Sequence, residues 1–209
     1  MGNNNEVNNI LAVDSSTGAC SVAVYSNGDI LSYLEINTPS LQARELLPMI
    51  ESALGESKIA YKDLSTIVCT VGPGSFTGVR IGLSAARAIG FAAGVKVIGF
   101  SSLEVLAYEA ITKNNGKPVM AVLNAGKGEV VYQNFSRDFE VESQAELIKS
   151  DILANSIDGD RLVVGFGSGS DIVYPKSNIL AKLAYSYPEK AVPPVPFYVR
   201  PPDAKLPTG

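Results

Sequence analysis

The sequence predicts an α/β protein with two domains, of which the second is reduced. Two observations predict this class. Short apolar runs typical of buried strands alternate with helical patterns, and the order of elements restarts after a polar turn at residues 114–116. We therefore expect a polar tail at residues 1–9, a first α/β domain at residues 10–115 and a second, reduced α/β domain at residues 116–209.

The first domain opens with strands. Apolar runs flank a polar turn at residues 14–18, and Asn27-Gly28 is a strong signal for a two-residue hairpin into a third strand. A later run is almost wholly apolar, as a strand buried on both faces should be. The five expected strands cover residues 10–13, 19–25, 30–36, 66–71 and 96–100.

Three helices are expected in the same domain, at residues 41–54, 76–93 and 101–112. The central helix follows a glycine-rich loop, and Ser75 stands at its N-cap position. Because almost all of its circumference is apolar or small, it has surface for two packing partners. A row of small residues forms a shallow groove into which another helix or a sheet packs closely. In this helix the row recurs at steps of four: Gly78, Gly82, Ala86, Gly90 and Gly94.

The second half also opens with strands, which suggests a duplicated α/β unit whose second copy is eroded. Its strands are expected at residues 119–124, 129–135 and 162–166, and its helices near residues 143–150 and 178–185. The chain closes with a proline-rich segment from Pro188 to Pro202, which we expect to run extended along the surface.

Composition excludes several classes of function. The chain has no histidine, which excludes Ser-His-Asp and Cys-His catalysis and histidine-ligated zinc. Its net charge of −4 provides no overall positive field, so the chain alone should bind RNA weakly at best. The first residues lack the pattern of a signal peptide, and no apolar run has the length of a membrane span. We expect a cytoplasmic protein with no membrane partner.

Two turns are candidates for contact with nucleotide phosphates, one rich in hydroxyls and one rich in glycine. An ordinary tight turn is the alternative for the first, and has the greater weight on pattern alone. Asn124 occupies the matching turn of the second half, where an amide can neither accept a proton nor carry charge to Mg²⁺. We therefore expect no catalytic residue, no metal ligand set and at most a vestigial nucleotide site. Its residues are Asp14, Ser15, Ser16, Thr17, Gly165 and Gly167.

Three stretches together resemble the bacterial TsaB (YeaZ) family. They are the Asp-Ser-Ser turn with its following strand, Leu-Leu-Pro-Met-Ile at residues 46–50, and above all Gly-Pro-Gly-Ser-Phe-Thr-Gly-Val-Arg-Ile-Gly at residues 72–82. The second half resembles the family only at residues 128–132 and 198–200. Gln42-Ala43 and Asn124-Ala125-Gly126 depart from the family's usual His-Ser and Asp-Ala-Arg.

The resemblance implies an actin-like (ASKHA, ribonuclease-H-like) fold and a part in making threonylcarbamoyladenosine in tRNA. In that family the subunit is non-catalytic. It dimerises with and stabilises the catalytic paralogue TsaD, meets the ATPase TsaE through the complex and reaches tRNA indirectly. A homodimer is implied when the partner is absent. No cofactor is implied for the isolated chain, whereas ATP or ADP with Mg²⁺ could lie at the complex interface.

We expect TsaD or a second copy to dock on the first two helices. The alternative function is a small-molecule kinase of the actin-like superfamily, which requires ATP turnover by the isolated chain. A peptidase is disfavoured, because the chain has no histidine and no convincing nucleophile–base pair. The expected interface residues are Leu46, Leu47, Met49, Ile50, Gly78, Val79, Ile81, Gly82, Leu83, Ala86, Ile89 and Gly90.

Overall fold

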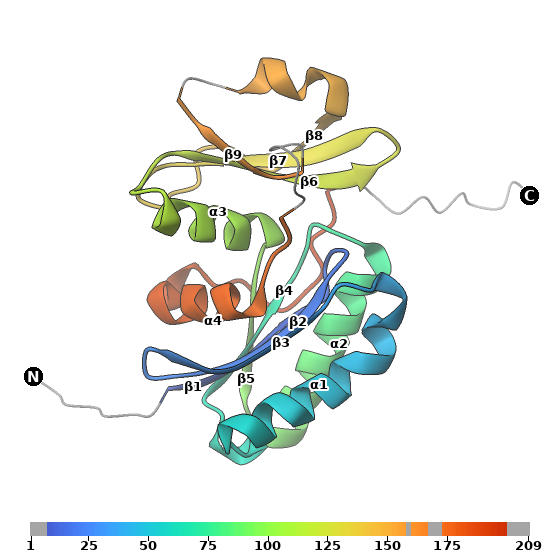
Figure 1. The fold of residues 1–209 in the computed structure, drawn as a ribbon, viewed down its shortest axis with the longest axis vertical. Helices are drawn as coiled ribbons and strands as arrows, with labels where there is room; N and C mark the ends of the chain where they lie inside the picture. Colours follow the sequence, from blue (N-terminus) through green and yellow to red (C-terminus); the bar gives the residue numbers. More distant parts are fainter. Residues whose placement is uncertain (1–7, 158–159, 167–172, 200–209) are drawn as a thin grey trace, which may run out of the picture.

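The computed structural model describes residues 8–157, 160–166 and 173–199, which form two sheets (Figure 1). The first sheet has the strand order β3-β2-β1-β4-β5. The first three strands form an antiparallel meander, and β4 and β5 continue the sheet parallel to β1. These strands are β1 (Asn9–Asp14), β2 (Cys20–Ser26), β3 (Asp29–Ile36), β4 (Thr66–Thr70) and β5 (Lys96–Phe100), which confirms all five predicted strands.

The second sheet has the order β8-β7-β6-β9 and starts in the same way as the first. Its first strand pairs antiparallel with the second and parallel with the last, as β1 does with β2 and β4. This repeat confirms a duplicated unit with a smaller second copy. The strands are β6 (Val119–Gly126), β7 (Glu129–Phe135), β8 (Glu146–Lys149) and β9 (Leu162–Gly165).

The helix predicted near residues 143–150 is wrong. This stretch forms the edge strand β8, which pairs antiparallel with β7 from Glu129↔Lys149 to Tyr132↔Glu146. Pairing satisfies backbone groups along one side of β7, and this tertiary contact outweighs the weak helical preference of the segment. A 3₁₀ stretch, η3 (Ser150–Ser156), follows it.

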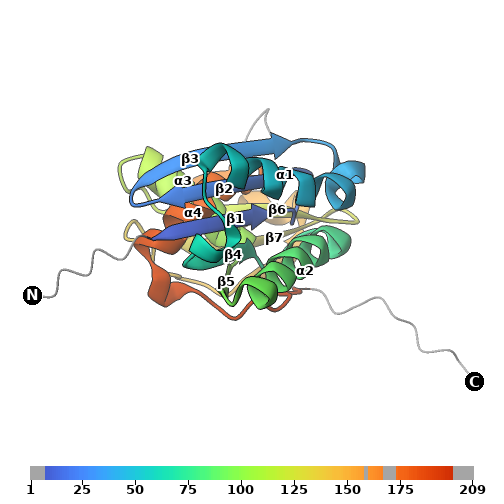
Figure 2. The same ribbon diagram turned by 90° about the horizontal axis from the view of Figure 1, so that it is seen from below.

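The α-helices form two layers. One pair, α1 (Gln42–Ser57) and α2 (Phe76–Ala93), covers one face of the first sheet (Figures 1 and 2). A second pair, α3 (Ser102–Lys113) and α4 (Ser177–Ser186), lies between the two sheets. The other 3₁₀ turns are η1 (Pro39–Leu41), η2 (Tyr61–Asp63) and η4 (Pro188–Lys190). Within the described ranges, no helix combines the length and the apolar character needed to cross a bilayer.

Each half of the sequence contributes one helix that packs on the sheet of the other half. The α3 helix comes from the first half of the sequence but packs mainly on β6 and β9, whereas α4 comes from the second half and packs on β1 and β2. One hydrophobic core therefore joins the sheets, with Phe100 and Leu103 beside Phe135 and Leu180. The proposed domain boundary at residue 116 stays a prediction.

The predicted helix caps are present. Ser75 Oγ accepts a hydrogen bond from the Gly78 N–H at 3.2 Å, and Gly94 ends α2 in the left-handed conformation with φ = 68°. Ser101 and Glu104 form a reciprocal capping box at the start of α3. The loop and the first turn of α2 are thereby fixed at the end of the first sheet.

Candidate functional site

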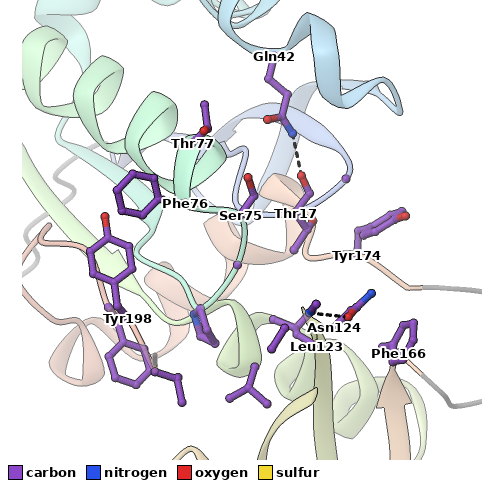
Figure 3. Close-up of a pocket in the computed structure, with 18 of the residues that line it drawn as sticks. Thr17, Gln42, Ser75, Phe76, Thr77, Leu123, Asn124, Phe166, Tyr174 and Tyr198 are labelled. Carbon is purple, nitrogen blue, oxygen red and sulfur yellow. Dashed lines mark hydrogen bonds between the residues drawn. The ribbon is translucent and has the colours of Figure 1, made fainter. Parts of the chain in front are cut away.

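A cleft of ≈ 1110 Å³ opens where the two halves meet (Figure 3). The β1–β2 turn, the loop before α2, the start of α1, the β6–β7 turn and the end of β9 all reach it, as does the extended segment at residues 197–199. The structure therefore brings the first candidate turn and the described start of the second to one cleft. The side chains that Figure 3 labels around it are Thr17, Gln42, Ser75, Phe76, Thr77, Leu123, Asn124, Phe166, Tyr174 and Tyr198.

Asp14 lies beneath the cleft and is completely buried. Its Oδ1 accepts hydrogen bonds from Thr70 Oγ1 at 2.6 Å, Ser16 Oγ at 2.7 Å and the Ser16 N–H at 3.2 Å. Burial raises its pKa to about 6, although these three hydrogen bonds favour the charged form. Its Oδ2 has no hydrogen-bond partner among the described residues. The carboxylate therefore organises the turn, and does not line the cleft.

The other residues of the β1–β2 turn form hydrogen bonds with the start of α2 and with its N-cap residue. Ser15 Oγ donates to the carbonyl of Gly78 at 2.8 Å, and the Ser75 N–H donates to the carbonyl of Ser16 at 2.7 Å. A Cβ on Gly78 would lie 2.1 Å from the Ser15 carbonyl oxygen, so only glycine fits there. Ser15 and Ser16 are buried, which leaves Thr17 as the candidate residue of this turn that lines the cleft.

Gln42 and Asn124, the two departures from the family pattern, both line the cleft and hold its turns in shape. Gln42 Nε2 donates to the carbonyls of Thr17 at 2.8 Å and Ala19 at 3.0 Å. Asn124 Oδ1 accepts a hydrogen bond from the Gly126 N–H at 2.8 Å, closing the β6–β7 turn on itself. Sequence reasoning missed the Gln42 contacts, which depend on where α1 begins relative to the turn.

Of the second candidate turn the structure describes Gly165 and Phe166, at the end of β9, and Phe166 lines the cleft. Gly165 is buried with φ = +94°, and a Cβ there would lie 2.1 Å from the Val122 carbonyl oxygen, so this glycine serves close packing. Gly167 lies outside the described residues. The described residues that line the cleft include no Asp, Glu, Lys or Arg, and the described chain contains no cluster of three or more potential metal-ligating side chains. These residues do not fit a metal–nucleotide complex.

Most of the residues expected to meet a partner lie in this chain's own core. The small row of α2 faces inward except for Gly94 at its end: Gly82 packs against Ser15, and Gly90 against Val97. These side chains are therefore not available to a partner in this conformation, because the chain's own sheet and turn use the groove that the small row forms. The buried members are Leu46, Met49, Ile50, Gly78, Val79, Gly82, Leu83, Ala86 and Gly90.

A few apolar side chains of the same helices lie outside this core and are exposed, on α1 beside charged residues such as Arg44 and Glu51. On α1, Leu47 is 53% exposed, whereas Ile81 and Ile89 on α2 are partly buried. A second row of α2, which sequence reasoning missed, has spacings of four, three and four, the spacing of a helix–helix seam. We call this row and Leu47 the outer seam. The row consists of Ile81, Ala85, Ala88 and Ala92, of which the last two are exposed.

Comparison with known sequences decides the family. The chain is 33% identical to the tRNA threonylcarbamoyladenosine biosynthesis protein TsaB of Escherichia coli over 165 residues, which cover 76% of this chain and 71% of that protein. It is 30% identical to the Haemophilus influenzae protein of the same name, with 84% of each chain covered. The chain belongs to the TsaB family.

A family model described as TsaD, tRNA N6-adenosine threonylcarbamoyltransferase, matches residues 40–196 of this TsaB-family chain. The structure of YeaZ from Pseudomonas aeruginosa superposes with a TM-score of 0.77 at 27% identity, covering 92% of this chain and all of that one. A second Pseudomonas aeruginosa structure, described as similar to peptidase YEAZ, gives a TM-score of 0.82 at the same identity and coverage. The family resemblance and the actin-like α/β fold are thereby confirmed.

Proposed function

We propose that this chain is the non-catalytic TsaB subunit of the cytoplasmic machinery that makes threonylcarbamoyladenosine in tRNA. It dimerises with and stabilises a TsaD-type catalytic chain, meets the TsaE ATPase through that complex and reaches tRNA indirectly. Support comes from the chain's relatives, which are named for this biosynthesis and include a TsaD-type family model. The observation that carries the proposal is the outer seam of α1 and α2, in which Leu47, Ala88 and Ala92 are exposed.

The outer seam suits a helical partner. Both helices bury one side in the first core, yet Leu47, Ala88 and Ala92 are exposed to solvent. Small residues let two helix pairs approach closely, which gives a four-helix contact with the corresponding helices of a paralogous chain. In the absence of that chain, the same seam would pair with a second copy, giving a homodimer.

The non-catalytic assignment rests on Asp14 and on the lining of the cleft. A kinase of the actin-like superfamily needs carboxylates that reach the metal–nucleotide complex. Here Asp14 is buried and bonded to Ser16 and Thr70, and the described residues that line the cleft carry no charge. We therefore assign any ATP, ADP or Mg²⁺ to an interface of the assembled complex, and treat the kinase as the alternative that ATP turnover by the pure chain would favour.

Glutamate at the outer seam should separate the complex without unfolding the chain. Leu47→Glu and Ala88→Glu place a charge in the proposed contact, and each should weaken binding to the TsaD-type chain of the same organism roughly thirtyfold or more, the size of an interface hot spot. Leu31→Glu is the control, because Leu31 is 45% exposed on the edge strand β3 and is not part of the outer seam. Isothermal titration calorimetry gives the affinities, and circular dichroism verifies the fold.

The control should bind as tightly as the wild type. Wild-type affinity in both seam variants would place the interface on another surface. An equal loss in Leu31→Glu would mean that glutamate acts through a general change in the protein, and this too contradicts the outer seam as the interface.

A further inference from the structure

A second, smaller groove runs beside α2 on a different arc from the outer seam. Its volume is ≈ 380 Å³, and its lining consists of Arg80, Leu83, Ser84, Arg87 and Pro196. Pro196 belongs to the extended segment at residues 191–199, which follows the edge of the first sheet: Val192 pairs with Gly99, and the Phe197 N–H donates to the Val71 carbonyl at 2.7 Å (Figure 2). We call this the arginine groove.

The two stretches of sequence that line the arginine groove carry basic side chains and no acidic ones. Residues 64–103 and 190–199 contain no Asp or Glu, although the whole chain has a net charge of −4. Arg80 and Arg87 are both exposed, and neither forms an ion pair within the described part of the chain. Two arginines that form no ion pair with a described residue therefore line the same groove of an acidic protein.

Arg80 is held in place by neutral groups. Its guanidinium carbon lies 3.6 Å from the centroid of the Phe76 ring, and its Nε donates to Tyr198 Oη at 2.9 Å. The Phe76 and Tyr198 rings are themselves stacked, with centroids 5.5 Å apart. The two terminal nitrogens of Arg80 have no hydrogen-bond partner among the described residues. A guanidinium fixed in this way can bind an oxyanion with little further loss of side-chain freedom.

We propose that the arginine groove binds carboxylates on a helix of the TsaD-type partner, an inference that rests on the proposed function. Arg80 and Arg87 are seven positions apart, so their Cα atoms are separated by about 10.5 Å along the helix axis. Two acidic residues seven apart on a partner helix have the same separation. A helix packed on the outer seam, or its neighbour in the partner, would carry them alongside α2.

The surroundings favour a protein partner over RNA. Phe91, one helical turn beyond Arg87, is 92% exposed, and Val195 beside Pro196 is 55% exposed. An arginine and an exposed aromatic side chain are the combination typical of protein interface hot spots. A phosphate backbone would gain little from two arginines on a chain whose net charge is −4.

Charge reversal tests the arginine groove. Arg87→Glu and the double variant Arg80→Glu/Arg87→Glu should weaken binding to the TsaD-type chain roughly tenfold or more at low salt, as for other interfacial charge pairs. The difference from wild type should shrink in 0.3 M NaCl, because salt screens the charges. Lys62→Glu is the control for Arg87→Glu, since it makes the same change in net charge at an exposed position in η2. Arg87 makes no contact with Phe76 or Tyr198, so the single variant also tests the groove without disturbing that stack.

The outcomes separate the two proposals. If the wild type binds and both arginine variants bind equally well with the same salt dependence, the arginine groove is not a carboxylate site, while the proposed function stands. If the wild type itself does not bind, the proposed function fails. If the variants bind the partner normally but the assembled complex loses affinity for tRNA, the groove binds phosphates and the carboxylate proposal is overturned.

Discussion

Replacing Gly78 by alanine is expected to destabilise the chain by about 4 kcal/mol or more, which places it among the most damaging single substitutions. The added Cβ would lie 2.1 Å from the Ser15 carbonyl oxygen and 3.2 Å from Gln42 Oε1. Neither the turn nor the helix can give way easily, because Ser15 Oγ donates to the Gly78 carbonyl and Gln42 Nε2 holds the carbonyl of Thr17. Urea denaturation followed by circular dichroism measures the loss.

Gly55 provides the matched control for this substitution. It lies in α1, is exposed, and a Cβ there meets nothing within 4 Å. Gly55→Ala should therefore leave stability unchanged or raise it by up to about 1 kcal/mol through helix propensity. If Gly78→Ala were as stable as Gly55→Ala, the contact between α2 and the β1–β2 turn would be looser than the structure places it.

Asp14 should make folding stability depend on pH. Its pKa rises from 3.8 to about 6 on folding, so between these values the folded chain binds more protons than the unfolded chain. Stability therefore falls as the pH rises through this window, and the full loss is about 3 kcal/mol above pH 7, at 1.36 kcal/mol per pKa unit. The neutral variant Asp14→Asn keeps an oxygen that can accept from Ser16 and Thr70 and should not show this loss.

Stability relative to wild type is the quantity to measure, by urea denaturation from pH 4 to pH 8. Asp14→Asn should gain stability relative to the wild type as the pH rises from 4 through about 6, and the difference should then level off. If the stability difference between Asp14→Asn and the wild type did not change with pH, the Asp14 carboxylate would be solvated. That result would contradict its burial beneath the cleft and favour a role at the cleft surface.

Much of the fold could be predicted because the local signals agree with the final structure. Asn27-Gly28 does turn a hairpin between β2 and β3, and Ser75 does cap α2. The turns at Thr17 and at the end of β9 both reach the cleft, since each follows a strand of its sheet. The proline-rich segment runs extended along the edge of the first sheet from residue 191 to residue 199, but its start was predicted wrongly, because Pro188–Lys190 forms the 3₁₀ turn η4.

What could not be predicted depends on contacts between distant residues. On α2 both the inward row from Gly78 and the outward row from Ile81 are small or apolar, so spacing alone does not say which one meets the sheet. The carbonyl of Ser15 decides this, because it leaves room only for hydrogen at Gly78. Residues 143–150 likewise form no helix, because residues 146–149 pair with the edge of β7 as the strand β8.

Threonylcarbamoyl transfer to tRNA by purified components tests the central claim most directly. The TsaD-type chain, TsaE and a source of threonylcarbamoyl-adenylate are assayed with and without this chain, and this chain is also assayed alone. We expect modified tRNA only when this chain and the TsaD-type chain are both present, and neither product nor steady ATP hydrolysis from this chain alone. Full activity without this chain, or ATP turnover by the pure chain that Asp14→Ala abolishes, would contradict its assignment as a non-catalytic partner subunit.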